Sequence, residues 1–420
     1  MTEQPGWRLG LLRLKRHLTR FRGIDRAYAS SREGRVYLQQ GQYQRALNYF
    51  NEALTIAPDY VEALTGRGQT YYGMRQYERA KADFARALRL KSRNFEAQFW
   101  LAQTLYILEE YHEAINAYSK ALWLKTRDWA TYANRGQAYA RVQEYRKALA
   151  DFKTALKLSP RSALTYTNRG LLYIELKQYK EALEDLNRAL EIDPNQRRAY
   201  FGKGQALYAL KDYERALIFY RQALQIEPTC QGYNNLGITL DALGRHQQAI
   251  EAYNCAIEYD PAHWVPYNNR GWSYHALGEN ASALADFERA LAAGPEEAYA
   301  AYLNRAWIFA GRGQFARALE ECDHILMWGI HDALAYAYRA GVRYWQGEDE
   351  QALADCERSL EKDPDCAEAY GVRGLVYKRQ KRTTDARVAL EKARELGHNL
   401  FWIDEDKEES DRILNKEDRT

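Results

Sequence analysis

The sequence predicts an all-α protein, an α-solenoid of about eleven helix-turn-helix units. Three observations predict this fold class. A five-residue phrase recurs at an almost constant spacing, each copy is followed by a second segment of shared pattern, and residues that favour helix are abundant while prolines number only 9 in 420. A chain of this length would otherwise suggest two or three globular domains, but a period of about 34 residues indicates a repeat architecture.

The first helix of each unit carries the recurring phrase. Its copies are YANRG at 132–136, YTNRG at 166–170, YNNLG at 233–237, YNNRG at 267–271 and YLNRA at 302–306. Glycine at the last position recurs at 136, 170, 204, 237 and 271, a spacing of 34 with one step of 33. The frame extends in both directions, so we expect eleven units over residues 27–400.

The second helix of each unit carries regularly spaced alanines. In YKEALEDLNRALEIDP, at residues 179–194, one alanine follows the glycine position by twelve residues and another comes seven residues later. Small residues on facing helices let the two backbones approach closely, and aromatic residues between them fill the remaining space. Proline ends many units, for example Pro160 and Pro194, because it cannot continue a helix.

This pattern resembles the tetratricopeptide repeat family. The resemblance extends over residues 27–400, and tyrosine stands where the family usually has tryptophan at the fourth position of a unit. It implies a right-handed superhelix of paired antiparallel helices, in which the first helix of each pair lines a concave groove. Residues 1–26 and 401–420 lie outside the predicted repeats.

The arginine of the phrase changes together with a residue sixteen positions later. Where the phrase has a basic residue, the residue sixteen positions later is usually acidic. Where the phrase has leucine, at Leu101 and Leu236, the later residue is alanine, Ala117 and Ala252. The basic and acidic pairs are Arg67 with Asp83, Arg135 with Asp151, Arg169 with Asp185, Arg270 with Asp286, Arg305 with Glu321, and Arg339 with Asp355. Because both positions switch together, we expect each pair to touch across the two helices of its unit, and we interpret the arginine as structural.

Asparagine is the residue of the phrase that we expect to bind a ligand. It occupies the sixth position of five units, as Asn134, Asn168, Asn235, Asn269 and Asn304. In the tetratricopeptide repeat family this position faces the groove, so the five asparagines should form a ladder. A side-chain amide both donates and accepts hydrogen bonds, and can therefore match the peptide groups of an extended chain. The ladder resembles the superhelix of the nucleocytoplasmic O-linked N-acetylglucosamine transferase, whose groove holds extended polypeptide.

Other residues of the same frame extend this predicted site. They are Gln137, Arg198, Gln205, Asn234, Asn268, Trp272 and Trp307, with Asp241 and His275 beside them. The alternative is that the asparagines only solvate the inner wall or cap contacts between neighbouring helices. Asparagine within a helix is a costly choice for solvation alone, which favours a binding role.

The two ends of the chain differ in charge. Residues 1–26 predict a basic amphipathic helix, with an apolar stripe that includes Trp7 and basic residues that include Arg13, Lys15, Arg16 and Arg20. Such a helix could cap the first repeat, because solenoid ends need capping, or it could dock on an anionic membrane surface or a partner. Residues 401–420 are acidic and predict a cap followed by a tail.

No pattern in the sequence indicates catalysis, so we expect a chain that is not an enzyme and uses no cofactor or metal. Phosphate-binding loops, dinucleotide fingerprints and nucleophile elbows are missing from the sequence, and the histidine spacings do not suit a metal site. The formal net charge of +3 gives little attraction for nucleic acid. Five cysteines without a C-x-x-C pair, and no apolar run of about 20 residues, suggest a cytoplasmic protein.

The sequence therefore predicts a protein-protein interaction scaffold. We expect it to bind an extended polypeptide or a partner protein in the concave groove through the asparagine ladder. The alternative is a membrane-surface or assembly adaptor that acts through the N-terminal basic helix.

Overall fold

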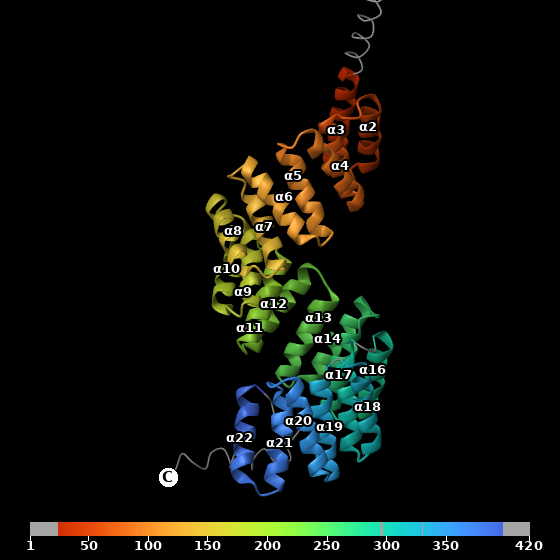
Figure 1. Ribbon diagram of the computed structural model, residues 1–420, viewed down its shortest axis with the longest axis vertical. Coiled ribbons are helices and arrows are strands. Elements are labelled where there is room, and N and C mark those ends of the chain that lie inside the picture. The colour runs from red at the N-terminus through yellow and green to blue at the C-terminus, as the bar shows by residue number, and fades with distance from the viewer. Residues whose placement is uncertain (1–23, 295–296, 330, 398–420) are drawn as a thin grey trace, which may run out of the picture. The chain divides into compact units, whose positions relative to one another are not determined.

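The computed structural model describes residues 24–397 apart from 295, 296 and 330. In this part of the chain there is no strand, and the helices follow one another in helix-turn-helix pairs (Figure 1). The first helices of the pairs are residues 24–39, α3 (Val61–Gly73), α5 (Phe95–Ile107), α7 (Trp129–Arg141), α9 (Ala163–Glu175), α11 (Arg197–Ala209), α13 (Cys230–Ala242), α15 (Trp264–Ala276), α17 (Tyr299–Gly311), α19 (Asp332–Gln346) and α21 (Ala367–Arg379).

The second helices are α2 (Tyr43–Ile56), α4 (Tyr77–Leu90), α6 (Tyr111–Leu124), α8 (Tyr145–Leu158), α10 (Tyr179–Ile192), α12 (Tyr213–Ile226), α14 (His246–Tyr259), α16 (Asn280–Ala293), α18 (Phe315–Trp328), α20 (Asp349–Lys362) and α22 (Thr383–Glu395). The predicted all-α solenoid of eleven units is confirmed.

The chain divides into two compact bodies, which join in sequence between Leu210 and Lys211. Within each body the two helices of a pair pack on each other, and the second helix of one pair packs on the first helix of the next. Consecutive first helices also touch, as α13 touches α15 and α15 touches α17. Each unit therefore buries its apolar side against its neighbours, which is how a repeat array builds a continuous core.

The helix ends have local causes in the sequence. Asn94, Asp128, Ser162 and Thr229 begin first helices, and each accepts a hydrogen bond from a backbone N–H three residues later. A residue in the left-handed conformation recurs just beyond the end of the first helix: Gly41, Arg75, Glu109, Gln143, Lys177, Lys211, Gly244, Gly278, Gly313, Gly347 and Lys381. This recurrence gives the units a common turn.

The glycine of the phrase is a packing residue. A Cβ atom added at Gly271 would lie 2.7 Å from Cε1 of Phe287, and one added at Gly136 would lie 2.9 Å from Cε1 of Phe152. Both phenylalanines are buried, and the carbonyl oxygen of Ala283 lies only 3.1 Å from the added atom at Gly271. The predicted close approach of the two helix backbones is confirmed.

Replacing Gly271 with alanine is expected to destabilise the second body. The new methyl group would push on the buried Phe287 ring, and overpacking of this kind costs about 1–3 kcal/mol. Gly311 is the matched control because it is also helical and an added Cβ would meet nothing within 4 Å. Gly311→Ala should be neutral or stabilising by up to about 1 kcal/mol, since alanine favours helix. Urea denaturation followed by circular dichroism compares the two, and equal stabilities would contradict the packing role.

Candidate functional site

Each predicted arginine and carboxylate pair is formed. The shortest N···O distances are 2.7 Å for Arg67–Asp83, 2.7 Å for Arg135–Asp151, 2.6 Å for Arg169–Asp185, 2.7 Å for Arg270–Asp286, 2.7 Å for Arg305–Glu321 and 2.9 Å for Arg339–Asp355. All but the Glu321 pair are bidentate, with Nε and Nη2 of the arginine donating to the two carboxylate oxygens. The phrase's arginine is therefore a structural residue, as the sequence predicted.

The same arginines also reach back to the preceding unit. The third guanidinium nitrogen, Nη1, donates to a polar residue sixteen positions earlier: Arg67 to Asn51 at 2.9 Å, Arg135 to Ser119 at 3.0 Å, Arg339 to Asp323 at 2.6 Å, and Arg270 to Asn254. The residues sixteen positions before Arg169 and Arg305 are Lys153 and Arg289. Their side chains have no hydrogen-bond acceptor, so they cannot form this bond. This partner was not predicted from the sequence, although a polar residue recurs at that position in four of the six units.

Hydrogen bonding and burial have opposite effects on the pKa of Arg67. The hydrogen bond to Asp83 raises the pKa of Arg67, so its guanidinium stays charged despite partial burial. Glu321 differs, because burial raises the pKa of its carboxyl and the contact with Arg305 offsets only part of this. Glu321 Oε2 and Arg305 Nε are both buried without a hydrogen bond. The extra methylene of glutamate thus leaves a single hydrogen bond where aspartate forms two.

Glu321→Asp is expected to raise the free energy of unfolding at pH 7 by about 1–2 kcal/mol, since each buried polar atom without a partner costs about 1–3 kcal/mol. The folded-state pKa of Glu321 lies above its ordinary value of 4.5, so its protonated form favours folding. That contribution is present below pH ~4.5 and is lost as the pH rises through the folded-state pKa. The gain from Glu321→Asp should therefore be larger at pH 7 than at pH 4. Denaturation at both pH values measures it, and a loss of stability at pH 7 would contradict the assigned geometry.

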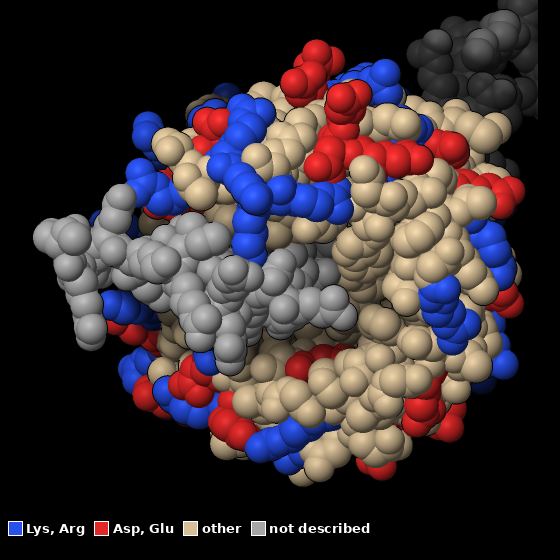
Figure 2. Space-filling model, turned by 90° about the horizontal axis from the view of Figure 1, so that it is seen from below, with Lys and Arg blue, Asp and Glu red and all other residues tan. Residues whose placement is uncertain are grey.

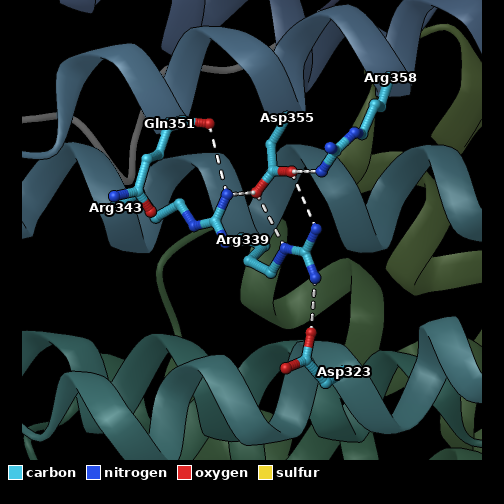
Figure 3. Close-up of polar contacts among 6 residues, drawn as sticks. All are labelled: Asp323, Arg339, Arg343, Gln351, Asp355 and Arg358. Carbon is cyan, nitrogen blue, oxygen red and sulfur yellow. Dashed lines mark hydrogen bonds and ion pairs between the residues drawn. The ribbon is translucent and has the colours of Figure 1, made fainter.

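A cluster of charged side chains surrounds Asp355 (Figure 3). Asp355 itself is completely buried. Besides Arg339, it contacts Nη1 of Arg343 at 2.8 Å and Nη1 of Arg358 at 3.2 Å. Arg339 in turn bonds Asp323 on α18, so the cluster joins α18, α19 and α20 (Figure 3). One carboxylate thus holds three guanidinium groups, which makes Asp355 the residue on which this packing depends.

Four asparagines of the predicted site form a hydrogen-bonded amide network in the second body. Asn304 Nδ2 donates to Asn268 Oδ1 at 3.0 Å, and Asn269 Nδ2 donates to Asn234 Oδ1 at 3.0 Å. Asn268 Nδ2 lies 3.4 Å from Asn269 Oδ1 and connects the two bonds. The network (Asn234, Asn268, Asn269 and Asn304) therefore links the first helices α13, α15 and α17. Each bond between helices runs from a sixth position to the fifth position of the preceding unit.

In the first body the amides are arranged differently. Asn168 on α9 is buried, its Oδ1 accepts a hydrogen bond from Nη1 of Arg198 at 3.3 Å, and its Nδ2 is buried without a hydrogen bond. Asn134 and Gln137 on α7 and Gln205 on α11 are half-buried, as is Asn235 on α13 of the second body. Of the five asparagines of the predicted ladder, Asn269 and Asn304 thus belong to the amide network and Asn168 bonds Arg198. The ladder as a binding site stays a prediction.

Asp241, which the sequence placed beside the groove, forms hydrogen bonds within the second body. Its carboxylate accepts from Ser273 Oγ at 2.8 Å and from the Tyr253 hydroxyl at 2.9 Å, and lies 3.0 Å from Nδ1 of His246. Its side chain is only 14% exposed. Nδ1 of His275 is similarly engaged, 2.6 Å from Asn280 Oδ1. These partners could not be recognised in the sequence, because Ser273 and Tyr253 lie on different helices.

The tryptophans of the predicted site lie next to other rings. The Trp307 ring centroid is 4.0 Å from that of Trp345, a residue outside the predicted site, and the Trp272 ring centroid is 5.3 Å from that of His275. Trp272, Trp307 and Trp345 are half-buried. Trp272 and Trp307 directly follow the last position of the phrase in consecutive units, on α15 and α17.

The tetratricopeptide repeat profile matches residues 129–162, 163–196, 198–230 and 231–263. Related repeat profiles match residues 34–74, and residues 65–130, 268–326 and 338–397. The chain belongs to the tetratricopeptide repeat family. The family resemblance of the sequence is thereby confirmed.

Several solved tetratricopeptide repeat structures are similar to this chain. Yeast Tom70 is 16% identical, covers 93% of this chain and 94% of its own, and has a TM-score of 0.51, which supports the shared fold. A tetratricopeptide repeat protein from Parabacteroides merdae is 23% identical over 56% of this chain and 93% of its own, with a TM-score of 0.47. YrrB, described as a protein of this family with an unusual peptide-binding site, is 25% identical over 44% of this chain and 95% of its own, with a TM-score of 0.36. No curated protein matches the chain.

Charged side chains of both signs are interspersed over the face of this tetratricopeptide repeat protein seen in Figure 2. Within residues 24–397, no described group of three or more His, Cys, Asp or Glu side chains could hold a metal ion. None of the described helices is long and apolar enough to cross a bilayer. Trp7, Arg13, Lys15, Arg16 and Arg20, and residues 401–420, lie outside the described residues, so docking through the N-terminal helix stays a prediction.

Proposed function

We propose that this chain is a protein-interaction scaffold that binds an extended polypeptide through the amide network and its neighbouring tryptophans. Membership of the tetratricopeptide repeat family supports the general role, because this repeat fold is typically a non-catalytic scaffold. The partner is expected to be a protein or a peptide. The similarity of the asparagine ladder to the transferase superhelix stays an expectation.

The observation that carries the proposal is the hydrogen-bonded amide network on α13, α15 and α17. A side-chain amide has two N–H donors and an oxygen that can accept two bonds. The Asn269 and Asn304 amides each use one N–H toward the preceding unit, and both residues are half-buried rather than enclosed. The second N–H of each amide is left to bind a peptide carbonyl. Because the amides already hold one another in place, little conformational freedom is lost on binding.

The charges around the network also favour a polypeptide backbone as the ligand. Arg270 and Arg305, on the same helices, are engaged by Asp286 and Glu321. Asp241 already accepts hydrogen bonds from the second body itself. Phosphate recognition depends on free cationic side chains, so these engaged arginines disfavour nucleic acid as a ligand.

The proposal is tested by selecting random-sequence peptides on the full chain and measuring the affinity of the enriched peptides by calorimetry. The double variant Asn269→Ala/Asn304→Ala should bind them at least about tenfold more weakly, the loss expected for residues at the centre of a binding site. Asn187→Ala, an exposed asparagine on α10, is the matched control and should bind normally. Urea denaturation confirms that all the proteins are folded.

Two results would contradict the proposal. Equal affinity of the wild type and the double variant would assign the amides to contacts between helices only. Failure to enrich any peptide would argue against binding of extended segments altogether.

A further inference from the structure

The first helix of the array, residues 24–39, exposes positions that are buried in every other unit. Ala29 and Val36 occupy the third and tenth positions of the first unit, and both are exposed, Val36 by 42%. The residues at these two positions are buried in all ten following units, as Ala63 and Thr70 are in α3. The first-helix face (Ala29, Val36 and the neighbouring Tyr28) is therefore a packing surface that nothing in the described part of the chain covers.

In the other units this surface is covered by the second helix of the preceding unit. Ala138, at the tenth position of its unit on α7, belongs to a hydrophobic cluster with Ala114 and Tyr118 of α6. The equivalent residue of α19, Val342, belongs to a cluster that includes Ala318 of α18. The occupant that suits the first-helix face is therefore a helix with the apolar spacing of a second helix.

The segment directly before residue 24 has that spacing. Second helices place four residues toward their neighbours at steps of three, four and three, and in α8 these are Tyr145, Ala148, Phe152 and Ala155. The same steps separate the apolar residues Leu11, Leu14, Leu18 and Phe21. Arg22 and Gly23 remain between this stripe and Ile24, and two antiparallel helices can be joined by so short a loop.

The charges of the first helix favour a basic occupant. Arg26 and Arg35 pair with acids of other helices, whereas Asp25, Arg32 and Glu33 form no ion pair with another described residue. Two of these three are acids. Residues 1–23 carry six basic residues and one acidic residue, so the segment is attracted to the remaining carboxylates.

A second copy of the chain is a poorer occupant. Its last second helix, α22, has Arg394 at a position where the ten other units have leucine or isoleucine. In α2 and α8 that residue is Leu54 and Leu156, and both are buried. The last helix thus has a charged residue where an apolar contact would be needed, as expected for a capped end of a repeat array.

We propose that residues 1–23 form a helix that packs on the first-helix face through Leu11, Leu14, Leu18 and Phe21, as the second helix of an incomplete unit that caps the array. This inference does not depend on the proposed function. It assigns the apolar stripe to a contact within the chain rather than to a membrane surface. Arg16 and Arg20 then lie on the opposite side of the cap and face outward.

The test measures how fast a maleimide labels the thiol of the variant Val36→Cys in the full chain. All five native cysteines lie at position 230 or beyond, so mass spectrometry of peptides distinguishes the new thiol. Adding Leu14→Glu/Leu18→Glu should speed this labelling at least about tenfold, because a covered residue reacts only when the cover opens locally.

Two controls accompany the measurement. Arg16→Glu/Arg20→Glu introduces the same number of glutamates on the opposite side of the proposed helix, and should leave the thiol protected. Val388→Cys, at a 58% exposed position on α22, should be labelled at the same rate whether or not Leu14 and Leu18 are replaced.

Two results would overturn the inference. One is equal labelling of Val36→Cys with and without Leu14→Glu/Leu18→Glu, which is also the result expected if the stripe docks only on a membrane. The other is protection that increases with protein concentration, which would mean that a second copy covers the face.

Discussion

Replacing Arg169 with leucine is expected to lower the free energy of unfolding by about 3–5 kcal/mol, the cost of leaving a buried charge without its partner. Arg169 Nε and Nη2 donate to the Asp185 carboxylate at 2.6 and 2.7 Å, and only 9% of the aspartate side chain is exposed. This unit is the cleanest place for the test, because Lys153 stands where other units place a third hydrogen-bond partner.

The double variant Arg169→Leu/Asp185→Ala is expected to recover most of that loss. Two units of the same chain already use this apolar combination, and Leu101 packs with Ala117 in a hydrophobic cluster there. Replacing a buried ion pair by well-packed apolar residues is often neutral or stabilising. Urea denaturation of the wild type, the two single variants and the double variant gives the coupling energy. If the double variant is no more stable than Arg169→Leu, the loss of stability does not come from leaving the Asp185 charge unpaired, and the prediction is wrong.

The second large effect is expected at Asp355. Asp355→Asn removes the one carboxylate shared by Arg339, Arg343 and Arg358, leaving three guanidinium groups close together (Figure 3). A guanidinium group stays protonated in proteins, so the three arginines cannot relieve the repulsion by losing a proton. We expect the second body to lose about 3–5 kcal/mol or more of stability.

Asp323→Asn is the matched control for this prediction. Asp323 contacts the same Arg339, but 55% of its side chain is exposed. Solvent screens such a pair, so the control should cost no more than about 1 kcal/mol. Thermal unfolding followed by circular dichroism compares the two variants. Similar shifts of the unfolding midpoint in both would show that burial of Asp355 does not determine its contribution.

The residues of the recurring phrase are expected to have different roles, which measurements of stability and of binding distinguish. The glycine and the arginine hold the two helices of a unit together, through the contact of Gly271 with Phe287 and the pairing of Arg169 with Asp185. Their replacement should change stability. Replacement of Asn269 and Asn304 should instead change binding, with a smaller effect on stability, because a hydrogen bond between side chains contributes about 0.5–1.5 kcal/mol.

The ion pairs could be predicted because every unit repeats the same contact with small changes. Leu101 with Ala117 and Leu236 with Ala252 show that the two positions switch together, which is the expected mark of touching residues. Four of the six arginines have a further partner sixteen positions earlier, and it varies between asparagine, serine and aspartate, so no single residue type identified it. The aromatic pair of Trp307 and Trp345 was missed because the two residues do not occupy equivalent positions in their units.

The sequence alone determined the period, the helix pairs, the family and the pairing of arginine with carboxylate, because each depends on a pattern repeated within a unit. Only the tertiary structure decided how neighbouring units meet. The offset that joins Asn269 to Asn234 and Asn304 to Asn268 depends on how consecutive first helices are displaced when they pack. The displacement between two helices depends on the packing of all the side chains in their contact surface, so it cannot be predicted from any single position of the repeat.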